Sequence, residues 1–280
     1  MAQTSSIEWT DATWNPVAGC TPVSPGCLNC YAARMALRLA TMPNGTGHKY
    51  AGTAKRARDG RPVFTGHVNL DREALDVPRH WRLPRIIFVN SMSDLFHEAV
   101  PFEFIRDVFR VMEECPQHTF QVLTKRPERA LDLSPDLPWP RNVWMGTSVE
   151  SDKYIGRVRT LSKIHDAAVR FLSCEPLLGP LARLPLKGMH WVIVGGESGP
   201  GARPMLEQWV LQIKEQCEAR GVAFFFKQWG GVRKQQFGRC LQGHVYSSLP
   251  AAPKLSSGKI ELSSTRQRGE RTPITLSFQG

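Results

Sequence analysis

The chain of 280 residues lacks a long apolar segment. No window approaches the roughly 18 uninterrupted apolar residues of a membrane helix. The first ten residues, MAQTSSIEWT, contain neither the basic start nor the apolar run of a secretory signal. We therefore expect a cytoplasmic protein that makes no contact with a membrane, in the host cytoplasm if a phage encodes it.

Four common catalytic signatures are also missing. The sequence contains no phosphate-binding G-x-x-x-x-G-K-[ST] loop, no H-E-x-x-H motif, no G-x-S-x-G turn and no G-x-G-x-x-G fingerprint. The glycine-rich stretch 195–199 does not have the spacing of a dinucleotide fingerprint, so we interpret it as a close approach of backbone segments. These absences disfavour a dehydrogenase or a metal-free hydrolase.

Acidic residues are scarce relative to basic ones. The chain has 25 Asp and Glu against 36 Lys and Arg, a net charge of +11, which favours a polyanionic partner such as DNA. Residues 231–280 hold eight of these cations and only two acids. We expect them to form a loosely structured basic C-terminal extension, which either contacts nucleic acid or is simply solvated.

The middle of the chain alternates between two patterns. Short apolar runs predict buried parallel strands, and two longer segments with helical spacing, 101–114 and 206–220, separate some of them. The predicted strands cover residues 13–17, 85–90, 120–124, 142–146, 169–173, 191–195 and 222–226. This order predicts an α/β fold with a parallel sheet, open or closed, in one unit of residues 1–230.

A basic segment at about residues 41–84 interrupts this alternation. We interpret it as an insertion after the first strand–helix unit. Its cations alternate with aromatic residues such as Trp81, a composition that suits a nucleic-acid backbone with a stacked base but also an ordinary surface loop. Tyr31 and Trp229 are further candidates for stacking on a base, although a role in the core is the more common one for all three aromatic residues.

Polar residues follow each of the six later strands. All carboxyl ends of a parallel sheet open on one face, where barrels and doubly wound sheets carry their sites. Helix capping explains any one of these polar groups, but it explains all six poorly. The sequence therefore predicts one shared site at the carboxyl ends of the strands.

The sharpest local signal is a cluster of three cysteines, Cys20, Cys27 and Cys30, spaced C-x6-C-x2-C in a loop rich in Pro and Gly. Seven cysteines in all, an odd number without an export signal, argue against a disulfide scaffold. A structural zinc site requires a fourth ligand, and the chain has no second C-x2-C pair. Three unrelated core cysteines and an iron–sulfur cluster with one open iron position are the other two interpretations.

This cluster, placed after the first strand of a βα-repeat chain, resembles that of the radical S-adenosylmethionine (SAM) enzymes. In that superfamily the usual spacing is C-x3-C-x2-C with an aromatic residue before the third cysteine. Here the first gap is six residues, Asn29 occupies the aromatic position and Tyr31 follows the third cysteine. The segments 91–101, 122–126 and 174–176 resemble strand-end motifs of the spore photoproduct lyase branch. Residues 9–231 as a whole resemble a phage and prophage family with a three-cysteine motif.

The resemblance implies a partial (βα) barrel of radical SAM type that binds a [4Fe-4S] cluster and SAM. The three cysteines are the implied iron ligands, and SAM is the implied ligand of the fourth iron. Lys125 is similarly placed to a lysine that pairs with the SAM carboxylate. The remaining cofactor-binding candidates are Ser91 and Ser93 for the amino group, Ser148 and Glu175 for the ribose, and Asn29. An external electron donor is implied as well.

The resemblance also implies a substrate in DNA. Our specific hypothesis is the isomerisation of a glycinyl–thymidine adduct from an N-linked to a Cα-linked form during phage DNA hypermodification. The first alternative is repair of a thymine lesion, as in the spore photoproduct lyase branch, for which Cys174 is a candidate hydrogen donor. The second alternative is a non-catalytic nucleic-acid-binding protein with a structural metal.

Overall fold

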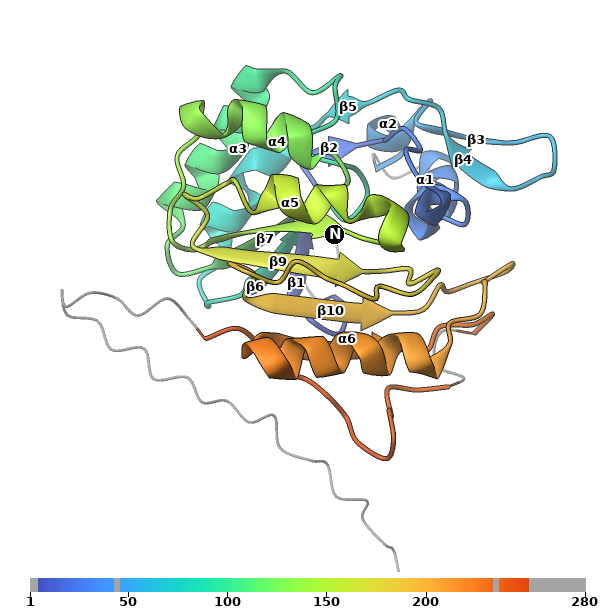
Figure 1. The fold of residues 1–280 in the computed structure, drawn as a ribbon. Coiled ribbons are helices and arrows are strands. Elements are labelled where there is room, and N and C mark those ends of the chain that lie inside the picture. The colour runs from blue at the N-terminus through green and yellow to red at the C-terminus, as the bar shows by residue number, and fades with distance from the viewer. Residues whose placement is uncertain (1–4, 43–45, 234–236, 252–280) are drawn as a thin grey trace, which may run out of the picture.

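Seven parallel strands form the central sheet of the protein, for which a computed structural model describes residues 5–42, 46–233 and 237–251. The strands lie in the order β1-β6-β7-β8-β9-β10-β11, and each pair of neighbours is parallel. They are β1 Ala12–Trp14, β6 Ile86–Val89, β7 Thr119–Thr124, β8 Val143–Ser148, β9 Val169–Cys174, β10 Trp191–Gly195 and β11 Ala223–Gln228. The sheet curls into a half-barrel, so the protein has the α/β fold of a partial (βα) barrel (Figure 1).

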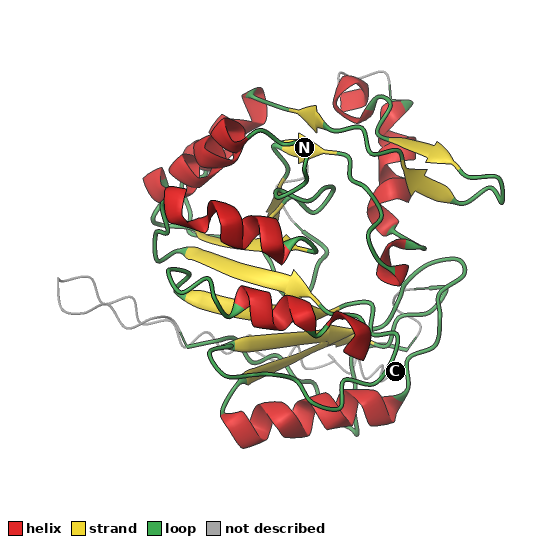
Figure 2. Cartoon of the chain, turned by 45° about the horizontal axis from the view of Figure 1, so that its top comes forward, coloured by secondary structure: helices red, strands yellow, loops and turns green. Residues whose placement is uncertain are grey.

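The helices that follow β6 cover the convex face of this half-barrel (Figure 2). The helices are α1 Tyr31–Ala40, α2 Thr46–Tyr50, α3 Phe102–Glu114, α4 Pro127–Leu133, α5 Gly156–Leu161 and α6 Glu207–Arg220. Four short 3-10 turns accompany them: η1 Pro25–Cys27, η2 Glu73–His80, η3 Ser134–Asp136 and η4 Asp152–Tyr154. Helix α6 ends, as the sequence predicts, at Gly221, whose φ of 63° suits a residue without a Cβ.

Alternation along the strands divides the core between the two faces of the sheet. In β9, Leu172 packs in the large cluster beneath the helices, whereas Phe171 belongs to a second cluster on the concave face. The concave cluster is aromatic and surrounds Trp191, with ring centroids 5.7–6.2 Å away; its neighbours are Trp9, Trp144, Phe171 and Phe225. Gly146 makes room for it, because a Cβ there would lie 2.4 Å from the Phe171 ring. The barrel interior is therefore filled below the level of the strand ends.

The predicted insertion contributes to two small antiparallel pairs, one within it and one with the chain after β1. β3 Ala54–Arg56 pairs with β4 Pro62–Phe64 in a hairpin, and β5 Asn69–Leu70 pairs with β2 Val17–Ala18. This segment has a small core of its own, in which Tyr50 and Phe64 pack against the alanines of α1. The expected single strand at residues 13–17 is in fact split between β1 and β2.

The expected C-terminal extension starts inside the folded unit. Leu241 is fully buried, the Phe226 amide donates to the Tyr246 carbonyl at 3.0 Å, and the Trp191 indole donates to the Ser248 carbonyl at 2.8 Å. The described part of the extension thus contacts β10 and β11 as far as Ser248. Residues 252–280, which carry the rest of the predicted basic extension, lie outside the described residues.

Candidate functional site

A cavity of about 1160 Å³ opens at the carboxyl ends of the strands. Its walls come from the cysteine loop (residues 19–30), from α1, from the N-terminal residues 5–9 and from the ends of strands β6 to β11. All three loop cysteines and all six predicted cofactor-binding residues line it: Cys20, Cys27, Cys30, Asn29, Ser91, Ser93, Lys125, Ser148 and Glu175. The structure therefore brings together nine of the ten site residues expected from the sequence.

The tenth residue, Cys174, does not line this cavity. It is fully buried on the helix side of β9, in the same cluster as Cys217 of α6. Burial raises the pKa of its thiol well above the ordinary value, and Cys217, Glu175 and Glu150 raise it further. This position does not support the expected role of Cys174 as a hydrogen donor to a substrate in the cavity.

Contacts from both sides hold the cysteine loop over the cavity. On one side the Gly66 amide donates to the Cys20 carbonyl at 3.1 Å. On the other side Arg203 donates to the Pro25 carbonyl at 2.9 Å, and Asn29 donates to the Gly201 carbonyl at 2.8 Å. The loop is thus fixed between the insertion and the turn that follows β10.

The thiols of this loop are free and partly exposed. Burial and the charge of Asp94 raise the pKa of Cys20 to about 12, although Arg126 opposes this shift. Burial also raises the pKa of Cys30, and Lys125 opposes it. Cations beside thiols favour the thiolate form, which is the form that binds a metal.

Arg126 is a buried cation that contacts one of the three loop cysteines directly. Its Nη1 lies 3.8 Å from the Cys20 sulfur, and its Nη2 donates to the Thr21 carbonyl at 3.1 Å. Asp94, at 3.2 Å, and Glu98, at 2.9 Å, hold the guanidinium in place. Arg126 was recognised from the sequence only as part of a strand-end motif; its contact with a cysteine on another loop is a tertiary feature.

Lys125 extends into the cavity from the end of β7 and pairs with Glu150 at 2.7 Å. Glu150 is fully buried and also binds Arg157 at 2.9 Å and the Ser24 hydroxyl at 2.6 Å. Burial opposes its ionisation, but Lys125, Ser24 and Arg157 together hold the pKa of this carboxyl below its usual range. Lys125 retains two further N–H donors for a ligand carboxylate.

Two serines after β6 lie at the cavity wall with their hydroxyl hydrogens already engaged. Ser91 donates to the Asn15 side chain at 3.0 Å, and Ser93 donates to the Val17 carbonyl at 2.9 Å. Each hydroxyl oxygen therefore keeps a lone pair that can accept a hydrogen bond from an ammonium group. The Tyr31 hydroxyl donates to the Ser91 carbonyl at 2.6 Å and places its half-exposed ring at the mouth.

Two carboxylates line the cavity after β9 and β10. Glu175 binds Lys227 at 2.8 Å and the Ser173 hydroxyl at 3.1 Å. Glu197, which follows β10, binds Arg203 at 2.5 Å and Asn29 at 3.0 Å. Burial raises the pKa of Glu197, but Arg203 and Asn29 outweigh burial and hold it below the usual range. The two amide hydrogens of Asn29 thus connect the cysteine loop to the turn that follows β10.

The glycine-rich stretch after β10 is a close approach of two backbones, as expected from the sequence. A Cβ at Gly196 would lie 1.9 Å from the Trp229 carbonyl oxygen, so only glycine fits there.

Of the three aromatic candidates for base stacking, Tyr31 and Trp81 line the cavity and Trp229 does not. The Trp229 indole instead donates to the Cys240 carbonyl at 2.8 Å.

A comparison of this sequence with known families matches residues 4–250 to DUF5131, described as a protein of unknown function. The chain belongs to the DUF5131 family. No curated protein and no solved structure matches it.

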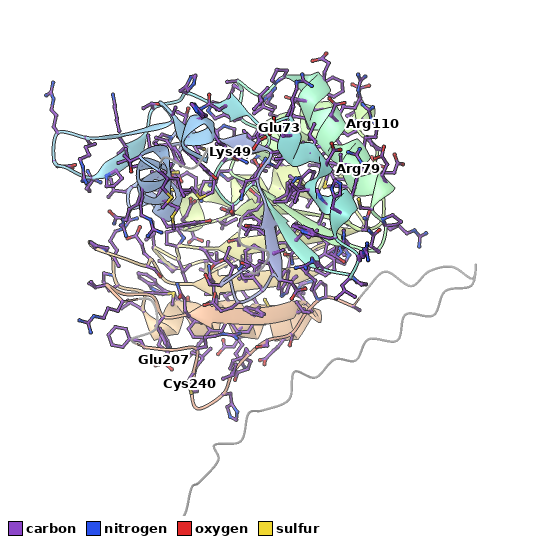
Figure 3. The ribbon with its side chains drawn as sticks, turned by 180° about the vertical axis from the view of Figure 1, so that it is seen from behind. Lys49, Glu73, Arg79, Arg110, Glu207 and Cys240 are labelled. Carbon is purple, nitrogen blue, oxygen red and sulfur yellow. The ribbon has the colours of Figure 1, made fainter. Side chains whose placement is uncertain are left out.

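The donor set of this DUF5131 protein suits an iron–sulfur cluster in its chemistry, because such clusters are held by cysteine thiolates. Three free thiols of one loop line the cavity, with Lys125 and Arg126 beside them. Within the described ranges, no group of three or more His, Cys, Asp and Glu side chains is drawn together as a preformed metal site. Cys240, the exposed seventh cysteine, lies at the edge beyond β11 and far from Lys49 of the insertion (Figure 3).

The helices of the described segments are all too short or too polar to cross a membrane.

Proposed function

We propose that this DUF5131 protein is a radical SAM enzyme that acts on a modified or damaged thymine base in DNA. Its specific reaction is the isomerisation of a glycinyl–thymidine adduct from the N-linked to the Cα-linked form. The observation that carries the proposal is the position of three free thiols on one loop at a polar cavity formed by the carboxyl ends of a parallel half-barrel.

Cys20, Cys27 and Cys30 would hold a [4Fe-4S] cluster through three of its irons and leave one iron open to the amino and carboxylate groups of SAM. When bound, this pair of cofactors supplies a carbon-centred radical able to abstract hydrogen from an unactivated position. The chain itself contributes the thiolates, and Arg126 stabilises the Cys20 thiolate through its N–H···S contact.

The cavity wall offers complementary groups for the amino-acid part of SAM. Lys125 has two N–H donors available beyond its bond to Glu150, and a carboxylate accepts such charge-assisted hydrogen bonds strongly. The Ser91 and Ser93 oxygens accept from an ammonium group. Glu175 keeps lone pairs that can accept from ribose hydroxyls.

Apolar residues on the concave side limit the access of water to the reacting atoms. Trp9 and Phe88 belong to the aromatic cluster and also line the cavity. A base paired within a duplex cannot reach such a cavity, so the substrate must be flipped out or single-stranded. Tyr31 and Trp81 are placed on the cavity wall, where a base could stack.

The conversion of substrate to product is redox-neutral, and the external donor supplies only the electron that starts the radical reaction. The bond between the thymine methylene and the glycine nitrogen breaks, and a bond from that methylene to the glycine α-carbon forms. One hydrogen moves from the α-carbon to the nitrogen, so substrate and product have the same composition.

The test is anaerobic reconstitution with iron and sulfide, followed by addition of SAM, dithionite and an oligonucleotide that carries N-linked glycinyl thymidine. We expect 5′-deoxyadenosine and the Cα-linked isomer in the wild type and neither in Cys27→Ala. Cys240→Ala removes an exposed cysteine outside the cavity and serves as the matched control.

Three results would contradict the proposal in different ways. Cleavage of SAM with an unchanged adduct would remove the isomerase assignment, and reversal of a thymine dimer in the same assay would replace it with repair. Binding of zinc without iron would remove the radical chemistry altogether and leave a metal-containing nucleic-acid-binding protein.

A further inference from the structure

The insertion and the preceding helix α1 together form a small lobe beside the cavity, made of α1, α2 and the β3–β4 hairpin. Helix α1 packs against both strands of the hairpin, and Tyr50 and Phe64 fill the space between them. Figure 1 shows the hairpin projecting beyond the carboxyl ends of the strands. We call this part of the chain the insertion lobe.

The hairpin carries a concentrated positive charge. Lys55, Arg56 and Arg58 are exposed, and Asp59 is the single acidic residue between positions 51 and 70. Asp59 pairs with Arg61 at 2.5 Å, so it does not neutralise the other three cations. The neighbouring helix α1 adds Arg34 and Arg38 to the same lobe.

Hydrogen bonds couple this hairpin to the cysteine loop. The Gly66 amide, two residues after β4, donates to the Cys20 carbonyl, and Arg61 donates to the Leu28 carbonyl at 3.4 Å. Gly19 approaches the same region so closely that a Cβ would lie 2.1 Å from the His67 carbonyl oxygen. A molecule bound to the hairpin therefore lies next to the mouth of the cavity.

The rim between the hairpin and the cavity is apolar and exposed. Leu28 is 45% exposed, Met35 38% and Tyr31 51%, although leucine and methionine are usually buried. A basic arm beside an exposed aromatic ring is the combination that binds single-stranded nucleic acid through phosphates and base stacking.

We propose that the insertion lobe is the arm that binds the phosphate backbone of the DNA strand, with Lys55, Arg56 and Arg58 as the contact residues and Tyr31 at the entrance for the base. This inference rests on the nucleic-acid substrate of the proposed function and assigns the surface that holds it. Phosphate contacts position the strand without reading its sequence.

The experiment measures the Kd of the full chain for a fluorescent single-stranded oligonucleotide over a series of salt concentrations. For single strands, log K falls with log salt, and each phosphate contact contributes about 0.7 to the steepness of this slope. The triple variant K55A/R56A/R58A is therefore expected to make the slope shallower by about 2. At about 0.1 M salt we expect its Kd to rise about 10- to 100-fold.

The matched control is K163A/R183A/K187A. These three exposed cations lie in the connections before β9 and β10 and do not line the cavity, and their removal changes the net charge by the same amount. We expect less than about a threefold change in Kd. The single variant Arg58→Ala, at the hairpin turn, should lower the slope by about 0.7 and keeps the test valid if the triple variant unfolds.

Equal losses in the hairpin and control variants would overturn the proposal, because general electrostatic attraction would then explain the binding. Unchanged binding of the hairpin variant would also overturn it and would indicate that the positive charge of the hairpin binds an acidic partner other than DNA, such as an electron-donor protein. The outcome is separable from the proposed chemistry. A wild type that cleaves SAM but binds no DNA contradicts the lobe and the DNA substrate and leaves the radical chemistry standing, whereas hairpin-dependent binding without iron contradicts the radical chemistry alone.

Discussion

The chain holds two sets of cysteines in contrasting surroundings: the loop cysteines Cys20, Cys27 and Cys30, and the core cysteines Cys115, Cys174 and Cys217. Burial raises the pKa of Cys20 and of Cys217 to about 12, so burial alone does not separate the sets. The loop set lines a cavity and lies beside two cations, whereas the core set packs among apolar side chains. Access and nearby positive charge, rather than burial, mark the cysteines that can bind a metal.

The largest expected difference between the two sets is in iron retention. We expect Cys30→Ala to lose the reconstituted iron completely, because an iron–sulfur cluster held by three thiolates has no spare ligand on this loop. Cys174→Ala should keep the wild-type iron content, measured by elemental analysis after gel filtration. Equal loss of iron in both variants would show that the loop cysteines and the core cysteines do not differ in iron binding.

Thiol labelling sharpens the same comparison in the metal-free protein. An alkylating reagent should modify Cys27 and the exposed Cys240 at least about 1,000-fold faster than Cys174, since a core thiol reacts only when the fold opens. Mass spectrometry of peptides gives the rates. Reconstitution should protect Cys27 but not Cys240, and labelling of Cys174 at the rate of Cys27 would contradict its burial.

The position of Cys174 also shows what the sequence could and could not predict. Phe171 and Ser173 face the concave side, so the two-residue period of a strand puts Cys174 on the helix side. The predicted strand ended at Ser173, one residue short of the observed end, and the prediction of Cys174 as a hydrogen donor took no account of the face on which its side chain lies. The same parity argument applied to β9 alone would have excluded Cys174 from the cavity.

The strands could be predicted from local patterns in the sequence, whereas the short helices and the tertiary contacts of the site could not. The six later strands were predictable because each is a continuous apolar run, and their bounds agree within two residues, whereas the predicted strand 13–17 is split between β1 and β2. Helices α4 and α5, of seven and six residues, are too short for a helical period to stand out. The bond of Glu150 to Ser24 joins residues 126 positions apart, so the sequence marks both as polar without pairing them.

The next prediction concerns the cations beside the loop cysteines. Lys125→Gln removes a charge-assisted bond to the SAM carboxylate, which typically contributes about 1.5–3 kcal/mol. We therefore expect the Kd of the reconstituted protein for SAM to rise about 10- to 100-fold, measured by calorimetry, with the iron content unchanged. Lys163→Gln, at an exposed position outside the cavity, is the control. Equal effects of the two variants would show that Lys125 does not contact SAM.

The smallest expected effect concerns how the loop is held. His97 Nδ1 accepts from the Ala99 amide at 3.1 Å, so its hydrogen lies on Nε2 and is donated to Thr21, next to Cys20, at 2.8 Å. Burial and the charge of Arg126 lower the pKa of His97 below its ordinary value of 6.5. The unfolded chain therefore binds this proton more readily than the folded chain does. The stability that neutral His97 provides is present above about pH 6.5 and is lost as the pH falls through the folded pKa.

Urea unfolding at pH 7 and pH 5.5 tests this attachment of the loop. We expect the free energy of unfolding of the wild type to decrease at the lower pH. His97→Gln should reduce that decrease without removing it, because burial also lowers the pKa of His118 and His190. His165→Gln, at an exposed position, should leave the decrease unchanged. If His97→Gln and His165→Gln gave the same pH dependence, the contact between His97 and Thr21 would not stabilise the fold, and the loop would depend on its backbone bonds to Gly66 and Arg203.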